Sequence, residues 1–207
     1  MNKKVGIMGG TFDPPHIGHL TIAETVRKSL NLSEIWFIPT GKIPHKSTNE
    51  TAPAFDRLNM VKLAVEENDN FFVNDTEVVR DSFSYTFETL EELRNKNPNI
   101  EFTYIVGADS LDYMEKWKEP SRIFNSCRVA VVNRPGILDE KIKVKKKELE
   151  DTFGGEIEII SMPPIDISST QIRKMIREGK SVIQFVPEKV IEYIKHNNIY
   201  KGKYGVS

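Results

Sequence analysis

Short apolar runs alternate with amphipathic helical patterns along this 207-residue chain. The runs KVGIM (4–8), EIWFIP (34–39) and EFTYIV (101–106) have the length of buried strands. The segments between them repeat apolar residues at helical spacing, as Leu20, Ala23 and Val26 do after the first run. Parallel strands need long crossover connections, which are usually helices. The alternation therefore predicts an α/β fold, a doubly wound and mostly parallel sheet covered by helices.

The same patterns predict the bounds of the individual elements. We expect strands at 4–8, 34–39, 71–75, 101–106, 128–132 and 156–161. We expect helices from about residue 18, at 56–67, at 138–151, at about 170–177 and around Pro187, and another one that Ser84 caps after a β-hairpin. No linker interrupts the series, so residues 1–207 are predicted to form a single domain.

Composition and charge exclude several classes of protein. The formal net charge of −1 gives no global attraction to nucleic acid or to an anionic membrane, so any anion site must be local. Cys127 is the one cysteine, which rules out an internal disulfide framework. No stretch approaches the roughly 20 apolar residues of a spanning helix, and the short apolar N-terminal run does not resemble a signal peptide. These features predict a cytoplasmic protein.

The loop after the first predicted strand, GGTFDPPHIGH (9–19), has the composition of an anion site. Gly9 and Gly10 allow a sharp turn and a close approach of the backbone to a ligand. The helix that follows offers free N–H groups and the positive end of its dipole. His16 and His19 are three residues apart at the start of this helix, so both imidazoles can face one point. Gly18 between them leaves space for a bulky ligand.

Three interpretations of this loop compete. It could be a structural turn with two satisfied histidines, or a metal site in which Asp13 joins His16 and His19. The third interpretation is a phosphate cradle, which also accounts for the glycines and the helix start. Neither a GxGxxG fingerprint nor a Walker lysine loop is present, so the loop is a nucleotide loop of another kind.

A second candidate cradle, ISSTQIR (167–173), precedes a late helix. Ser169 or Thr170 could serve as the N-cap, and capping alone would explain one hydroxyl. It does not explain three hydroxyls in a row followed by Arg173, whose guanidinium can reach an anion held at the same helix end. Two separate phosphate cradles suit a triphosphate better than a monophosphate.

These motifs resemble those of a known family. A His-x-Gly-His loop after a first strand is similar to the nucleotidyltransferase superfamily, and the whole string GGTFDPPHIGH resembles the bacterial nicotinate mononucleotide adenylyltransferases. The ISSTQIR string looks like the ISSTxIR signature that the superfamily uses on ATP phosphates. The resemblance implies a Rossmann-like nucleotidyltransferase fold in which the C-terminal helices, from about residue 170, complete the ATP site.

A set of site residues follows from the motifs and from loops that end other predicted strands. Asp109 could accept hydrogen bonds from ribose hydroxyls, and Arg134 could contact phosphate. The catalytic candidates are His16, His19 and Arg173. The full ATP-binding prediction is Gly9, Gly10, Thr11, Phe12, His16, Gly18, His19, Gly107, Asp109, Arg134, Ile167, Ser168, Ser169, Thr170 and Arg173.

The acceptor side rests more heavily on the resemblance. The loop TGKIPHK (40–46) follows the second strand, and Ile43 replaces the first proline of the family's Pro-Pro-His-Lys string. The resemblance implies that Lys46 binds phosphate and that Thr86 and Trp117 contribute to the mononucleotide pocket. An exposed indole can stack on a pyridine ring. The predicted acceptor-binding residues are Thr40, Lys46, Tyr85, Thr86 and Trp117.

The expected activity is transfer of the adenylyl group of ATP to nicotinate mononucleotide, with Mg²⁺ accompanying ATP. Its partners would be these two small molecules, without nucleic acid or membrane, and a homo-oligomer is compatible with the sequence. Asp13 is the one carboxylate considered for the Mg²⁺, and no protein metal site is predicted. Two alternatives stay open. The acceptor could be nicotinamide mononucleotide or phosphopantetheine, or the chain could be a non-catalytic nucleotide sensor.

Overall fold

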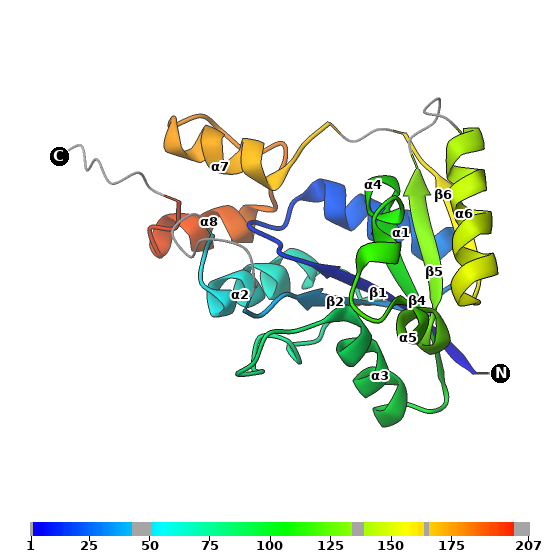
Figure 1. Cartoon of the computed structure of the whole chain (residues 1–207). Helices are drawn as coiled ribbons and strands as arrows, with labels where there is room; N and C mark the ends of the chain where they lie inside the picture. Colours follow the sequence, from blue (N-terminus) through cyan, green and yellow to red (C-terminus); the bar gives the residue numbers. More distant parts are fainter. Residues whose placement is uncertain (1, 43–50, 134–138, 164–165, 201–207) are drawn as a thin grey trace. The chain divides into compact units, whose positions relative to one another are not determined.

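The computed structural model describes residues 2–42, 51–133, 139–163 and 166–200, in which strands and helices alternate (Figure 1). The strands are β1 (Lys3–Gly10), β2 (Glu34–Pro39), β3 (Phe71–Val73), β4 (Ile100–Gly107), β5 (Arg128–Asn133) and β6 (Ile157–Ser161). The helices are α1 (Ile17–Ser29), α2 (Ala54–Val65), α3 (Thr86–Lys96), α4 (Ala108–Leu111), the 3₁₀ turn η1 (Met114–Lys116), α5 (Pro120–Ser126), α6 (Asp139–Phe153), α7 (Ser169–Arg177) and α8 (Glu188–His196).

The six strands form one all-parallel sheet in the order β3-β2-β1-β4-β5-β6, which confirms the predicted fold class. Lys3 pairs with Ile100 at the start of the β1–β4 ladder. The chain adds β2 and β3 on one side of β1 and then adds β4, β5 and β6 on the other. This reversal of strand order makes the carboxyl ends of β1 and β4 the place where such folds bind ligands.

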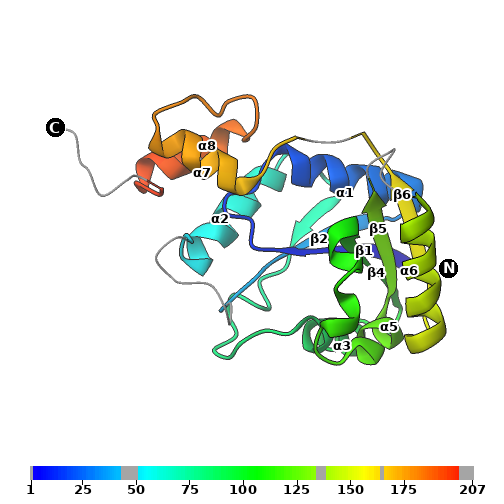
Figure 2. The same ribbon diagram turned by 45° about the horizontal axis from the view of Figure 1, so that its top comes forward.

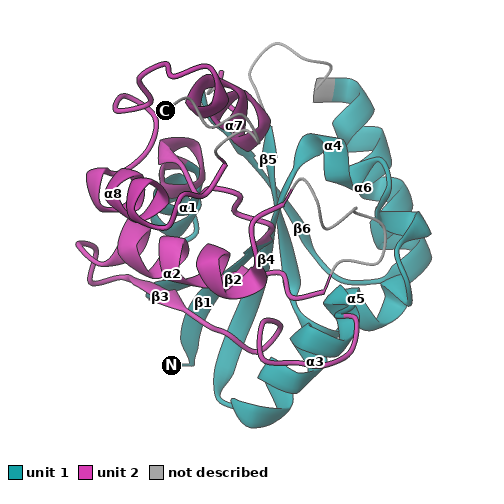
Figure 3. Cartoon of the chain, turned by 90° about the vertical axis from the view of Figure 1, so that its left-hand side faces the viewer, with its two compact units in different colours: residues 1–9, 22–36, 84–164 teal, residues 10–21, 37–83, 165–207 magenta. Residues whose placement is uncertain are grey.

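The chain groups into two compact units, each built from three separate stretches (Figure 3). Unit 1 comprises residues 1–9, 22–36 and 84–164, and unit 2 comprises residues 10–21, 37–83 and 165–207. Unit 2 therefore contains both candidate phosphate segments of the sequence, the loop after β1 and the start of α7.

The core of unit 1 is the apolar interior of its parallel strands. Val5 and Ile7 of β1 are buried, as are Val129 and Val131 of β5. Near-continuous burial is expected of parallel strands that helices cover on both faces. Gly6 packs closely against its neighbours, since a Cβ there would lie 2.5 Å from Cδ1 of Ile35, whose side chain would have to shift. The helix α6 runs alongside β5 and β6 (Figures 1 and 2).

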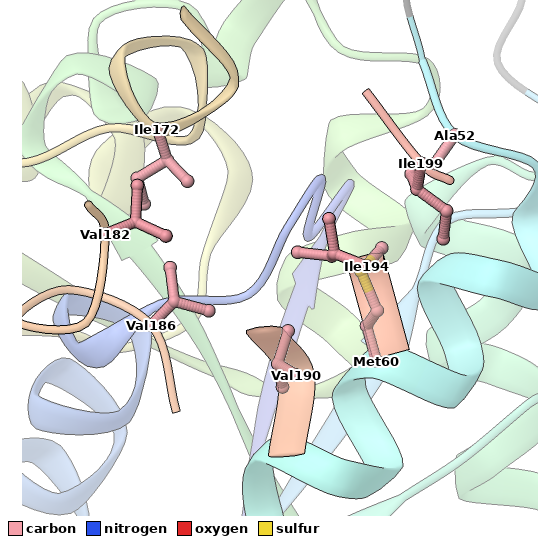
Figure 4. Packing of buried hydrophobic residues seen from close by; sticks show 8 residues of the cluster. All are labelled: Ala52, Met60, Ile172, Val182, Val186, Val190, Ile194 and Ile199. Atoms are coloured by element: carbon pink, nitrogen blue, oxygen red, sulfur yellow. The ribbon is translucent and has the colours of Figure 1, made fainter. Parts of the chain in front are cut away.

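The core of unit 2 is a cluster of aliphatic side chains between helices. The helices α2 and α8 lie side by side (Figures 1 and 2). The helix α7 adds Ile172 to the same cluster. We call these residues the C-terminal cluster (Figure 4): Ala52, Met60, Ile172, Val182, Val186, Val190, Ile194 and Ile199. The cluster fixes the C-terminal helices onto the segment that precedes α2, which positions the start of α7.

Several predicted bounds are wrong in detail. The first strand does not end at Met8 but continues through both glycines to Gly10. Ser84 does not cap α3, because the helix begins at Thr86 and Tyr85 takes the N-cap position without a side-chain bond. Instead of the expected hairpin, residue 83 forms an isolated parallel bridge to Lys42.

The segment between β4 and β5 contains three short elements that the sequence did not predict. They are α4, η1 and α5, of four, three and seven residues. Elements this short do not complete enough turns to produce a recognisable helical period. Within the described parts of the chain, no helix has the length and apolar character needed to cross a membrane.

Gly41 is a position where the backbone leaves no room for a side chain. A Cβ at Gly41 would lie 1.9 Å from the backbone carbonyl oxygen of Glu77. We therefore expect Gly41→Ala to lower the free energy of unfolding by about 1–3 kcal/mol in urea titrations, since the loop must shift. Gly107→Ala is the matched control, because a Cβ there meets no atom within 4 Å. Equal stability of the two variants would contradict this close approach.

Candidate nucleotide site

The loop after β1 is held in an unusual backbone conformation by an aromatic contact. Phe12 has a φ of 49°, a left-handed conformation that is uncommon for a residue with a bulky side chain. Its ring is buried and lies edge-on to His19, with 5.0 Å between ring centroids, and also contacts Phe37 at 5.8 Å. The phenyl ring thus supports an imidazole from within the core. A contact of Phe12 with ATP would have to come from its backbone.

The two predicted histidines lie against each other at the start of α1. Their ring centroids are 3.8 Å apart and their planes are tilted by 33°. The backbone N–H of His16 donates to Nδ1 of His19 at 3.2 Å. A neutral imidazole that accepts at one nitrogen carries its proton on the other. Nε2 of His19 is therefore the donor nitrogen of this ring.

Burial keeps both imidazoles uncharged at neutral pH. Desolvation lowers the pKa of His16 to about 4, and only 6% of this residue is exposed. Desolvation and the neighbouring His16 lower the pKa of His19 to about 3. The structure therefore presents two neutral imidazoles at the start of α1. Among the described residues, Nδ1 of His16 has no hydrogen-bond partner.

The start of α7 is bonded directly to the loop after β1, both in unit 2. Ser169 Oγ donates to the carbonyl oxygen of Pro14 at 2.9 Å. Arg173 Nη1 donates to the carbonyl oxygen of Asp13 at 2.8 Å. The residues joined by these two hydrogen bonds are 155 and 160 positions apart in the sequence. The structure thus brings together the two candidate phosphate segments.

The cap of α7 differs from the prediction. The N-cap is Ser168, whose side chain accepts the N–H of Gln171 at 3.2 Å, and not Ser169 or Thr170. The reason is that the helix begins one residue earlier than expected, at Ser169. Thr170 Oγ1 accepts from Nη2 of Arg173 at 3.3 Å. Each of the three hydroxyls therefore has a hydrogen-bond partner within the protein.

Arg173 keeps donor capacity in spite of these contacts. Its side chain is 17% exposed, and Nε is buried with no hydrogen-bond partner among the described residues. A guanidinium has five N–H donors in a fixed fork and suits phosphate oxygens. The arrangement places a positively charged donor at the N-terminal end of α7, where the helix dipole also favours an anion.

Asp13 is buried and fully engaged within the protein. It is 3% exposed. Its Oδ1 accepts the N–H of Ala52 at 3.0 Å and the hydroxyl of Tyr200 at 2.5 Å, and its Oδ2 lies 3.5 Å from Nη1 of Arg173. The carboxylate is thus a poor ligand for a cation, because an arginine and two hydrogen-bond donors already surround it. No cluster of three or more metal-binding side chains occurs among the described residues.

Arg57, in α2, is an important residue that the sequence analysis missed. It is 2% exposed, and its guanidinium donates to the carbonyl oxygens of Thr11 at 2.8 Å, Thr40 at 2.6 Å and Ala52 at 3.1 Å. A further bond reaches Gly41 at 3.3 Å. The arginine thus joins the ends of β1 and β2 to the start of α2. The sequence carries no signal for this role, because the carbonyl oxygens that Arg57 satisfies lie outside its own helix.

The other predicted ATP residues are distributed over both units. Gly10 lies against the ring of Phe12, and Gly18 is buried within α1. Ile167 is half-buried and packs against the C-terminal cluster. In unit 1, Gly9 is half-buried at the end of β1, and Gly107 and Asp109 are exposed where β4 meets α4. Arg134 lies outside the described residues.

The predicted acceptor residues likewise divide between the units. Thr40, in unit 2, accepts from Arg57 through both its carbonyl and its hydroxyl oxygen. Lys46 lies outside the described residues. Tyr85 and Trp117 are half-buried in unit 1, where the ammonium of Lys118 lies 3.9 Å from the Tyr85 ring centroid and Tyr104 lies edge-on to Trp117 at 6.2 Å. Thr86 is the first residue of α3 and is also half-buried.

The described tautomer and protonation states can be measured directly. We expect ¹⁵N NMR of histidine-labelled protein to show His16 and His19 uncharged at pH 6, with the proton of His19 on Nε2. An ordinary histidine, with a pKa near 6.5, would be mostly protonated there. Titration of His19 near pH 6.5 would contradict the burial described here.

These low pKa values also predict how stability depends on pH. The unfolded chain binds protons at both histidines below about pH 6.5, while the folded protein does so only below about pH 4. Stability contributed by the neutral imidazoles is therefore present above pH 6.5 and is lost as pH falls toward 4. Urea titrations at pH 7.5 and at pH 5 measure the decrease in the free energy of unfolding between these two values. This decrease should be smaller for His16→Asn than for the original chain, and equal decreases would contradict the prediction.

Comparisons with known proteins agree with this fold. Residues 7–175 match the model of the cytidylyltransferase-like family. The chain is 41% identical over 196 residues to a probable nicotinate-nucleotide adenylyltransferase of Clostridium botulinum, covering 94% of this chain and 98% of that one. It is 40% identical to the Clostridium tetani protein of the same name, covering 96% and 100%.

Solved structures show the same fold at lower sequence identity. The nicotinic acid mononucleotide adenylyltransferase of Plasmodium falciparum, in a complex with NaAD, is similar with a TM-score of 0.78 and 21% identity. That likeness covers 96% of this chain and 97% of the Plasmodium chain. With the paired His-x-Gly-His and Ser-Ser-Thr segments described above, these comparisons place the chain in the cytidylyltransferase-like family, among the nicotinate-nucleotide adenylyltransferases.

Proposed function

We propose that this chain transfers the adenylyl group of ATP to nicotinate mononucleotide, giving nicotinate adenine dinucleotide and pyrophosphate. The observation that carries the proposal is a pair of hydrogen bonds between the start of α7 and the loop after β1. Arg173 donates to Asp13, and Ser169 donates to Pro14. It supports a single anion site with donors from both segments. The names of the clostridial relatives support the choice of acceptor.

The proposed reaction is a direct displacement. An oxygen of the acceptor's 5′-phosphate attacks the α-phosphorus of ATP, the bond between that phosphorus and the bridging oxygen breaks, and pyrophosphate leaves. The attacking phosphate is already ionised near neutral pH, so no general base is required. Catalysis then depends on positioning and on stabilising negative charge in the transition state. No covalent intermediate with the enzyme is needed.

The site residues divide this work by their chemistry. His19 would donate through Nε2 to an oxygen of the α-phosphate, because Nδ1 already accepts from the backbone. His16 lies against it and would assist the same phosphate. Arg173 would hold the β- and γ-phosphates through the exposed part of its guanidinium. The hydroxyls of Ser168 and Ser169 would act mainly by fixing the helix start.

The remaining predicted contacts extend the proposal beyond unit 2. We propose that Gly107 and Asp109 bind adenosine, that Thr40, Lys46, Tyr85, Thr86 and Trp117 bind the acceptor, and that the chain is a single nucleotidyltransferase domain. Mg²⁺ would enter with ATP on its phosphate oxygens and offset their charge, since Asp13 is engaged elsewhere. The proposed location is the cytoplasm, and the proposed partners are the small molecules ATP and nicotinate mononucleotide.

The acceptor is tested by measuring pyrophosphate release with purified protein, ATP and Mg²⁺. We expect rapid release with nicotinate mononucleotide, slower release with nicotinamide mononucleotide, and none with phosphopantetheine. Equal kcat/KM for the two mononucleotides would refute the substrate choice while leaving adenylyl transfer intact. Release with none of the three acceptors would favour the alternative of a nucleotide sensor.

The role of His19 is tested by replacing it. His19→Ala should lower kcat by about 10²-fold or more, because the donor acts most strongly on charge that develops in the transition state. His196→Ala, an exposed histidine at the end of α8, is the matched control and should keep full activity. A rise in the KM of the acceptor alone, with kcat unchanged, would argue against the assigned role.

A further inference from the structure

Tyr200 brings a side chain from the C-terminal end of the described chain to the loop after β1. The preceding Ile199 is buried in the C-terminal cluster, where Figure 4 shows it next to Ala52. Tyr200 itself has a φ of 65°, a left-handed conformation that is unfavourable for a residue with a side chain. Contacts of its side chain must therefore help to hold it there. One such contact is the hydrogen bond that the Tyr200 hydroxyl donates to Oδ1 of Asp13, at 2.5 Å.

Asp13 links Tyr200 to Arg173. One of its oxygens, Oδ1, accepts from Tyr200 and from the N–H of Ala52, while the other lies 3.5 Å from Nη1 of Arg173. The same Nη1 donates to the backbone carbonyl of Asp13. Burial and the adjacent carboxylate raise the pKa of the Tyr200 phenol, so it stays protonated and remains the donor. The carboxylate of Asp13 thus accepts hydrogen bonds from a phenol and a backbone amide, and it lies beside a guanidinium.

We infer that Tyr200 is a positioning residue that sets the orientation of the Arg173 guanidinium through Asp13. The inference rests on the proposed function, in which Arg173 binds the phosphates of ATP. Without the phenol, a buried carboxylate loses one of its donors and attracts the arginine more strongly. The guanidinium is then drawn toward Asp13 and away from the anion at the start of α7. Tyr200 itself touches neither substrate.

The test compares Tyr200→Phe with Tyr193→Phe. The control is well matched, because the Tyr193 hydroxyl also donates to an aspartate, Asp56, at 2.9 Å. It also accepts from Asn59, and none of these residues contacts the phosphate segments in the interactions described above. We expect Tyr200→Phe to raise the KM for ATP about fivefold or more, as loss of one hydrogen bond to a charged group would. The KM for nicotinate mononucleotide should change less than about twofold, and Tyr193→Phe should leave both constants unchanged.

A double-mutant cycle separates positioning from a general structural effect. In an Arg173→Ala background, Tyr200→Phe should cause no further rise in the KM for ATP, because the group on which it acts is gone. The same fold-change in both backgrounds would overturn the inference. So would an unchanged KM for ATP in Tyr200→Phe alone, or an equal rise in Tyr193→Phe.

Calorimetric titration with ATP and Mg²⁺ keeps the test independent of turnover. If the original protein releases no pyrophosphate with any acceptor, the proposed function fails, but the Kd for ATP can still be compared between the variants. The positioning role would be supported if Tyr200→Phe raises the Kd for ATP in the original protein and leaves this Kd unchanged in the Arg173→Ala background. Equal Kd values in the original protein and Tyr200→Phe would overturn it.

Discussion

The buried guanidinium of Arg57 is the interaction on which the nucleotide site depends. It satisfies carbonyl oxygens of three backbone segments, at Thr11, at Thr40 with Gly41, and at Ala52. These carbonyls lie beyond the ends of β1 and β2 and before α2, where no regular ladder can satisfy them. A charged donor fork meets several acceptors at once, which a neutral side chain could not do. The loop after β1 can therefore be held with its histidines in place.

Asp13 connects this framework to the late part of the chain. Its backbone carbonyl and carboxylate both face Arg173, and the neighbouring Pro14 carbonyl accepts from Ser169. The C-terminal cluster then keeps α7 and α8 on α2 through buried aliphatic contacts. The consequence is that the two candidate phosphate segments, which are far apart in sequence, are joined by hydrogen bonds.

The fold could be predicted well from the sequence because its signals are local. The apolar runs gave the strands to within about two residues, and Glu34–Pro39 agreed at both ends. The errors fell where local signals are weak or compete. Ser84 was an attractive cap, but the helix begins beyond it, and the short α4, η1 and α5 have no usable period.

The site was predicted less completely because part of it depends on long-range contacts. The glycines, His16, His19 and Arg173 stand out by residue type and spacing. By contrast, the neutral state of the imidazoles follows from burial, and the tautomer of His19 from a single backbone N–H. Arg57 reaches Thr11, 46 residues away, and Tyr200 reaches Asp13, 187 residues away, and no sequence pattern indicates either contact.

We propose that the His-x-Gly-His loop and the start of α7 form one site for the phosphates of ATP. A crystal structure with a non-hydrolysable ATP analogue and Mg²⁺ tests this most directly. We expect an α-phosphate oxygen within hydrogen-bonding distance of Nε2 of His19, and the terminal phosphates hydrogen-bonded to Arg173 at the start of α7. A triphosphate bound away from either group would contradict it.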